Sequence, residues 1–362
     1  MESVSRLRPP ETRPHTSVFR VARAWYPVAF ARDLGKAPQA IRLLGTPLAL
    51  FRTASGEVAA LLDRCPHRNV PLSGGCVRGE HLACPYHGWE FARDGVCRNI
   101  PGLIGEATHA RGRRAAAYPC RESDGLVWVW GDPESAPDTG PFALPRLGDG
   151  YATVDRVVDA PGTLHATLEN ALDVPHTAFL HGGLFRTATT RNPIEAIVRR
   201  YADRAEVEYV GEPRPSGLVG RLLSPSGGVV THFDRFFMPS IAQVEYRIGD
   251  ENHILVTAAA SPIADFETRL FARIQFRTRV PAAVVRPLLE PIAMRIFAQD
   301  TRMLAAQTAN IQTFGGEQFE STPIDFIGPH IYRLLRDAEA GTAPEASPDG
   351  APVFERRVRF EA

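Results

Sequence analysis

Two short clusters of metal-binding side chains stand in the first quarter of the chain. Cys65 and His67 form one cluster, and Cys84 and His87 form the next after an interval of sixteen residues. Two thiolates and two imidazoles can hold a tetrahedral zinc ion, or a [2Fe–2S] centre in which the thiolates bind one iron and the imidazoles the other. Zinc fingers pair cysteine with cysteine and histidine with histidine. Each cluster here supplies one of each, which favours the iron–sulfur centre because each loop can then reach both irons.

A second group of possible ligands lies near the middle of the chain. Asn170, Asp173 and His176 follow one another at intervals of three residues, on one side of a helical segment, and His181 comes five residues later. Pro175 disfavours helical geometry at the residue before it. A break at this point would allow the two imidazoles to converge on one metal ion.

Two imidazoles need a carboxylate to complete the ligand triad that leaves positions open on a non-haem iron(II). The best candidate is Asp300, which falls in the apolar stripe of a helical pattern over residues 283–311. An unpaired carboxylate in such a stripe would cost on the order of several kcal/mol. We therefore expect His176, His181 and Asp300 to bind one metal ion.

Composition limits the classes of protein that the chain can represent. The 362 residues include 41 basic and 41 acidic side chains, and this balance argues against a nucleic-acid-binding protein. No apolar run reaches the ~18–20 residues of a membrane span, and the first residues lack the apolar segment of a secretory signal. Five cysteines do not make a disulfide framework. These features predict a cytoplasmic protein.

The elements that must position the two ligand groups fall into two regions, and the length also suggests two domains. Strand-like alternation predicts an all-β domain over residues 22–132, after a lead-in of residues 1–21. Residues 133–150 are rich in proline, aspartate and glycine and are expected to form a linker. A helix over 163–173, strands within 195–280 and the long helical pattern predict a second domain over 151–340. Residues 341–362 remain as a C-terminal tail that ends in a short strand.

The first region resembles the Rieske domain of the Rieske non-haem iron ring-hydroxylating oxygenases. The likeness rests on Trp25–Ala29, Cys84–Phe91 and Gly125–Gly131 and extends over residues 22–132. Pro85 stands where Rieske proteins of respiratory complexes carry an additional cysteine, so the likeness is to the oxygenase or ferredoxin type. The second group, with its late aspartate, resembles the catalytic domain of the same family.

This resemblance implies an α+β fold, with an all-β Rieske [2Fe–2S] domain and a helix-grip domain in which an antiparallel sheet wraps a long C-terminal helix. It implies that Cys65, His67, Cys84 and His87 bind the cluster and that His176, His181 and Asp300 bind a mononuclear Fe(II) ion. Asp173 would bridge this iron site to the cluster of a neighbouring subunit in a homotrimer, and Asn170 would lie near the iron. One departure is Gln299, where members of the family often have glutamate.

The function that the resemblance implies is that of a terminal oxygenase. It would use O2 to hydroxylate or oxidatively demethylate an aromatic or polycyclic small molecule, as in the monooxygenase branch that includes the vanillate demethylases and pheophorbide a oxygenases. The chain contains no dinucleotide-binding motif, so electrons from NAD(P)H are expected through a separate flavin reductase, with or without a ferredoxin. Alternatives are an arene cis-dihydroxylating dioxygenase, a Rieske electron-transfer protein without oxygenase activity, and a zinc-stabilised ligand-binding protein.

Overall fold

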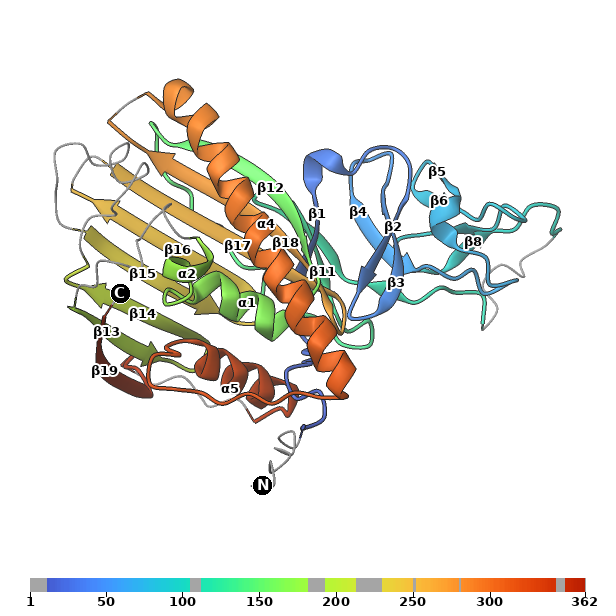
Figure 1. The fold of residues 1–362 in the computed structure, drawn as a ribbon. Helices are drawn as coiled ribbons and strands as arrows, with labels where there is room; N and C mark the ends of the chain where they lie inside the picture. The colour runs from blue at the N-terminus through green and yellow to red at the C-terminus, as the bar shows by residue number, and fades with distance from the viewer. Residues whose placement is uncertain are drawn as a thin grey trace, which may run out of the picture.

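The computed structural model describes residues 12–104, 112–181, 193–212, 230–249, 252–279, 281–342 and 349–361. Strands dominate its first third, and a large sheet with helices on one face makes up the rest (Figure 1). The α+β fold expected from the sequence is confirmed.

The N-terminal region consists of three small antiparallel sheets and two short 3-10 helices. The first sheet has the order β1–β11–β10, the second β2–β3–β4–β9 and the third β5–β6–β7–β8. The bounds are β1 Trp25–Phe30, η1 Ala31–Asp33, β2 Gln39–Leu43, β3 Thr46–Arg52, β4 Val58–Leu62, η2 Leu72–Gly74, β5 Cys76–Arg78, β6 His81–Ala83, β7 Glu90–Phe91, β8 Cys97–Asn99, β9 Ala117–Tyr118, β10 Cys120–Ser123 and β11 Leu126–Trp130.

The loops that carry Cys65 and Cys84 emerge from an apolar core between the second and third sheets. Both cysteines belong to this buried cluster, together with Phe51, Leu72 and Phe91. Apolar packing therefore holds the base of each loop, while the loop tips remain at the surface.

The larger region is built on an eight-stranded antiparallel sheet with the order β12–β18–β17–β16–β15–β14–β13–β19. Helices α1, α2, α4 and α5 lie on one face of it (Figure 1). The bounds are β12 Ala152–Ala160, α1 Leu164–Leu172, α2 Thr177–Leu180, β13 Pro193–Arg200, β14 Arg204–Val210, β15 Val230–Phe237, β16 Ile241–Ile248, β17 Asn252–Ala264, β18 Glu267–Arg277, α4 Ala282–Phe314, α5 Gly328–Glu339 and β19 Phe354–Glu361.

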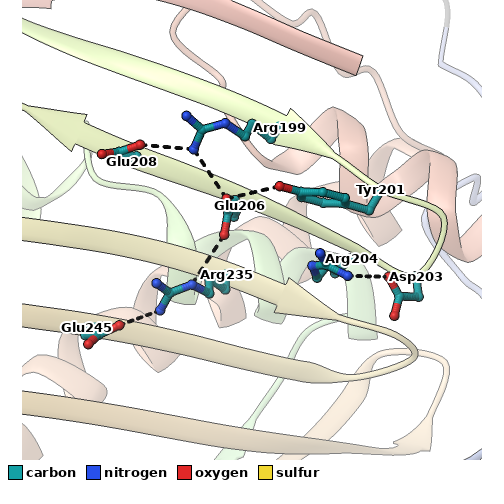
Figure 2. A network of polar contacts seen from close by, with 8 residues as sticks. All are labelled: Arg199, Tyr201, Asp203, Arg204, Glu206, Glu208, Arg235 and Glu245. Carbon is teal, nitrogen blue, oxygen red and sulfur yellow. Dashed lines mark hydrogen bonds and ion pairs between the residues drawn. The ribbon is translucent and has the colours of Figure 1, made fainter. Parts of the chain in front are cut away.

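Alternation along the strands separates a core face from a polar face. On β14, Ala205, Val207 and Tyr209 are buried beneath the helices, and the residues between them point to the opposite face. There, a row of ion pairs crosses neighbouring strands, in which Arg199 contacts Glu206 and Arg235 contacts both Glu206 and Glu245 (Figure 2). Opposite charges in register stabilise this face without apolar burial.

The two terminal segments, which the sequence suggested to be a lead-in and a tail, both make contacts with the larger region. β19 pairs with β13 as the edge strand of the large sheet. Near the N-terminus, Thr16 and Ser17 donate hydrogen bonds from their backbone and side-chain groups to the buried carboxylate of Glu317. The domain limits proposed from the sequence therefore remain predictions. None of the helices in the described ranges has the length and apolar character needed to cross a membrane.

Candidate metal centres

Three of the expected ligands converge between α2 and α4. The Nε2 atoms of His176 and His181 are 3.3 Å apart. Asp300 Oδ1 lies 3.1 Å from Nε2 of His181 and 3.6 Å from Nε2 of His176. One ligand atom from each of the three residues therefore falls within 4.8 Å of the others.

The local sequence explains how the two histidines come together. Thr163 caps α1 by accepting a hydrogen bond from the backbone of Ala166, and the helix ends at Leu172. Asp173 is extended, with φ −94° and ψ 102°, so it does not continue the helix as the spacing had suggested. The proline that follows disfavours helical geometry at Val174, the next residue.

The chain then forms the single turn α2, which His176 and His181 flank as its N-cap and C-cap. Because one short helical turn separates them, both imidazoles face the same side. Asp300 reaches this side from the middle of α4, which crosses above the sheet (Figure 1).

The electrostatics of this group suit a bound cation. Burial by itself would lower the pKa of His176, but the carboxylates of Asp173 and Asp300 outweigh it and raise the pKa to about 9. Burial also tends to raise the pKa of Asp300, yet the neighbouring imidazoles of His176 and His181 lower it overall. Asp300 Oδ1 is buried and has no hydrogen-bond partner of good geometry. Two imidazoles and one carboxylate aimed at one point match the ligand set of a non-haem iron(II) site.

Each imidazole is held by an acceptor at its other nitrogen. His176 Nδ1 lies 3.2 Å from Asp173 Oδ2, and His181 Nδ1 lies 3.0 Å from Gln299 Oε1. An acceptor at Nδ1 places the proton there and leaves Nε2 available to a metal ion. The role of Gln299 was not foreseen from the sequence, although it immediately precedes the expected ligand Asp300.

A cavity of about 690 Å³ opens beside this group, and Asn170, Asp173 and His176 all line it. Glu169 and Asp325 also face the cavity, which is therefore rich in carboxylates. Burial raises the pKa of Glu169, the negative charges of Asp173 and Asp325 raise it further, and the result is about 7. Sequence reasoning missed Glu169, and the signal that could have found it is its position one helical turn before Asp173.

The four residues of the first group divide into buried thiols and outer imidazoles. Cys65 and Cys84 are 1% and 4% exposed. The rings of His67 and His87 lie 4.6 Å apart at the loop tips, where His87 is exposed and His67 stacks on Trp89. This separation of two sulfur ligands inside and two nitrogen ligands outside is the one that a Rieske [2Fe–2S] centre requires.

Backbone turns set this geometry. Cys65 and Cys84 each accept a backbone hydrogen bond, from Asn69 and Gly88 respectively, which closes a tight loop. Asn69 and Gly88 have positive φ values of 63° and 68°, a conformation that glycine and asparagine tolerate best. Burial raises the pKa of the Cys65 thiol to about 11, so a thiolate at this position needs a bound cation.

A single zinc ion does not fit this group. Tetrahedral zinc would bring its ligand atoms within about 4 Å of one another. Among the described residues, only His176, His181 and Asp300 bring three ligand atoms within 4.8 Å. Cys65, His67, Cys84 and His87 do not bring three ligand atoms as close as this, as expected for ligands divided between two irons.

Comparison with known proteins agrees with both centres. Residues 24–108 match the Rieske [2Fe-2S] domain model, and residues 162–338 match the model of the vanillate O-demethylase oxygenase C-terminal domain. Together these two matches account for more than two thirds of the chain.

Individual relatives point in the same direction. The oxygenase component of dicamba O-demethylase from Stenotrophomonas maltophilia is 39% identical over 171 residues, which are 44% of this chain and 48% of the relative. Chlorophyllide a oxygenase from Chlamydomonas reinhardtii is 36% identical over 183 residues, 50% of this chain and 27% of the relative. The matched part therefore spans about half or less of these relatives. The crystal structure of dicamba monooxygenase bound to dicamba has the same fold, with a TM-score of 0.73 at 24% identity over 90% of this chain and 99% of that one.

The chain therefore belongs to the Rieske non-haem iron oxygenases, a class of oxidoreductases whose members carry a Rieske cluster and a mononuclear iron.

Proposed function

We propose that the chain is the terminal oxygenase of a multicomponent system, which uses O2 to hydroxylate or oxidatively demethylate an aromatic or polycyclic small molecule. The observation that carries this proposal is the convergence of His176, His181 and Asp300 in a chain that also holds a Rieske ligand set. A Rieske electron carrier needs the cluster alone, so it does not account for three convergent ligands in a second domain, of which one is buried and two are half-buried.

The proposed site roles follow from the contacts. Cys65, Cys84, His67 and His87 would hold the [2Fe–2S] cluster, and the three convergent residues would hold Fe(II). When bound, the cluster supplies single electrons and the mononuclear iron supplies open positions for O2. Asp173 would hold the Nδ1 proton of His176, while Asn170 would contribute a polar wall beside it.

Electron transfer between the two sites would take place between neighbouring copies of the chain. β5–β8, which flank the cluster loops, lie at the far end of the molecule from α2 (Figure 1). The cluster tip presents the exposed side chains of Arg64, Arg68 and Tyr86. The positive charges of the two arginines are opposite to those of the carboxylates that line the cavity beside the iron ligands. This complementarity supports a head-to-tail ring, most simply a homotrimer, with Asp173 as the bridge.

The side chains on the inner face of the large sheet indicate the chemical class of the substrate. Val244, Val256 and Ile274 stand in register on β16, β17 and β18 and face the helices. They are only half-buried, although apolar side chains on the core face of a sheet are usually covered. An apolar ring system is the chemical class that would cover them. Two relatives are named for reactions on small organic molecules, dicamba and chlorophyllide a.

Electrons would come from a separate ferredoxin or flavin reductase oxidising NAD(P)H, as the name of one relative as an oxygenase component suggests. We place the protein in the cytoplasm, where the five cysteines would stay reduced.

Metal analysis under anaerobic conditions tests the proposal. We expect about three irons and two sulfides per wild-type chain and an EPR signal of the Rieske type after reduction. The variant His176→Ala should retain about two irons and the same signal. Two irons in both fully loaded proteins would leave an electron carrier, and zinc without sulfide would refute both centres. Labelled O2 then separates monooxygenation, with one labelled oxygen atom transferred, from dihydroxylation with two.

A further inference from the structure

The two imidazoles of the proposed iron site are held by acceptors of different charge. His176 donates from Nδ1 to a carboxylate, Asp173, whereas His181 donates to the neutral amide oxygen of Gln299 at 3.0 Å. Gln299 also precedes Asp300 on α4. Two successive residues of α4 therefore supply one metal ligand, Asp300, and the hydrogen-bond acceptor of another ligand, His181.

The atom of Gln299 that faces His181 Nδ1 is the amide oxygen, which accepts hydrogen bonds and does not donate them. The proton of a neutral His181 therefore resides on Nδ1. Nε2 then carries the lone pair, and it is this atom that lies 3.1 Å from Asp300 Oδ1. Since the His181 side chain is 2% exposed, water is not available to hold the ring in its place.

A neutral acceptor also limits the negative charge around the metal ion. Asp300 would bind the ion directly, and Asp173 is one imidazole away, so two carboxylates already balance the two charges of Fe(II). A carboxylate at position 299 would add a third. Extra negative charge in a partly buried site stabilises the more positive oxidation state, because the charges interact in a low dielectric.

We propose that Gln299 is a positioning residue that fixes the tautomer and orientation of His181 and that, by being neutral, keeps the site poised to hold iron in its reduced state. This inference rests on the proposed function, because it presumes that the three convergent residues bind iron. It assigns two separable properties to one side chain: the hydrogen bond supports metal affinity, and the absence of charge sets the potential.

Two substitutions separate these properties. Gln299→Leu removes the acceptor at similar size, and Gln299→Glu keeps an acceptor but adds a charge. Gln312→Glu introduces the same charge on the exposed face of the same helix and serves as the matched control. Anaerobic titration with Fe(II), after selective removal of the mononuclear iron, measures the dissociation constant. An EPR-monitored redox titration of the high-spin ferric signal measures the midpoint potential.

We expect Gln299→Leu to weaken Fe(II) binding by about 10- to 100-fold, the usual effect of losing a partner behind a metal-binding histidine. Gln299→Glu should bind at least as tightly as wild type, and its potential should move in the negative direction, while Gln312→Glu should change neither quantity. Wild-type affinity in Gln299→Leu, or an unchanged potential in Gln299→Glu, would overturn the inference. The Rieske signal of each variant reports that the chain has folded. If His176→Ala binds iron as wild type does, the proposed iron site itself fails, which is a different outcome.

Discussion

A buried histidine in the core of the large sheet allows a quantitative prediction about pH and stability. His232 on β15 is fully buried, with Nδ1 2.6 Å from Glu212 Oε2 and Nε2 3.1 Å from Asp234 Oδ1. Its ring is stacked between Tyr209 and Tyr246. Because both ring nitrogens face carboxylates, both are expected to carry protons, and the imidazole is a cation.

The magnitude follows from the pKa of His232. Burial alone would lower this pKa, but the charges of Asp234 and Glu212 outweigh the burial and raise it from 6.5 to about 9. One pKa unit corresponds to about 1.4 kcal/mol, so the raised value represents about 3 kcal/mol of folding free energy. Protonated His232 therefore stabilises the fold fully below pH 6.5, and this contribution is lost as the pH rises through about 9.

The assay is the melting temperature of the metal-loaded protein between pH 6 and pH 10. For a region of this size, about 3 kcal/mol corresponds to about 6–12 °C. Asp234→Asn removes one of the two charges that raise the pKa, so its loss of stability should begin at lower pH than in wild type. Asp159→Asn is the control, because Asp159 forms an exposed ion pair with Arg269 on β18. Identical pH profiles for wild type and Asp234→Asn, or a His232 NMR resonance that titrates near pH 6.5, would refute the reasoning.

Three further predictions concern electron transfer, the turn between β7 and β8 in the Rieske domain, and assembly. Asp173→Asn should retain both iron centres but slow cluster reoxidation in the presence of substrate and O2 by about 10- to 100-fold, measured by stopped-flow absorbance; a wild-type rate would exclude the bridging role. Gly95→Ala should lower the melting temperature and cluster content far more than Gly56→Ala, since both glycines have positive φ but only at Gly95 would a Cβ overlap a backbone oxygen, that of Ala115. Equal effects would show that the overlap is relieved without cost. The double substitution of Arg64 and Arg68 by glutamate should shift sedimentation from a ring towards single chains, and an unaltered profile would count against the proposed charge pairing.

Much of the site could be predicted from the sequence because metal ligands leave a local signal. The spacing of Cys65, His67, Cys84 and His87 depends on the size of the cluster and on two short loops, both of which are properties of nearby residues. Strand alternation and the helical pattern around Asp300 are likewise local consequences of burying one face of each element. These features were sufficient to predict two domains and the two ligand groups, whereas the fold class followed from the resemblance to the oxygenase family.

The environment of the ligands could not be predicted in the same way. His181 and Gln299 are 118 residues apart, and no spacing rule connects them. The raised pKa of Glu169 depends on burial beside α5 and on the charges of Asp173 and Asp325, which approach it only in the folded chain. Likewise, the sequence around His232 is an ordinary strand pattern, and nothing in it indicates that Glu212 would lie at the other ring nitrogen.

The sequence by itself thus determined which side chains could bind iron and in which kind of domain each set would stand, because residue type and short spacing decide ligand chemistry. Only the tertiary structure decided the acceptor behind each imidazole, the charges that surround the site and the face on which the cavity opens. Hydrogen bonds and pKa values depend on distances of a few ångströms and on exclusion of water, and packing between distant segments of the chain is what sets both.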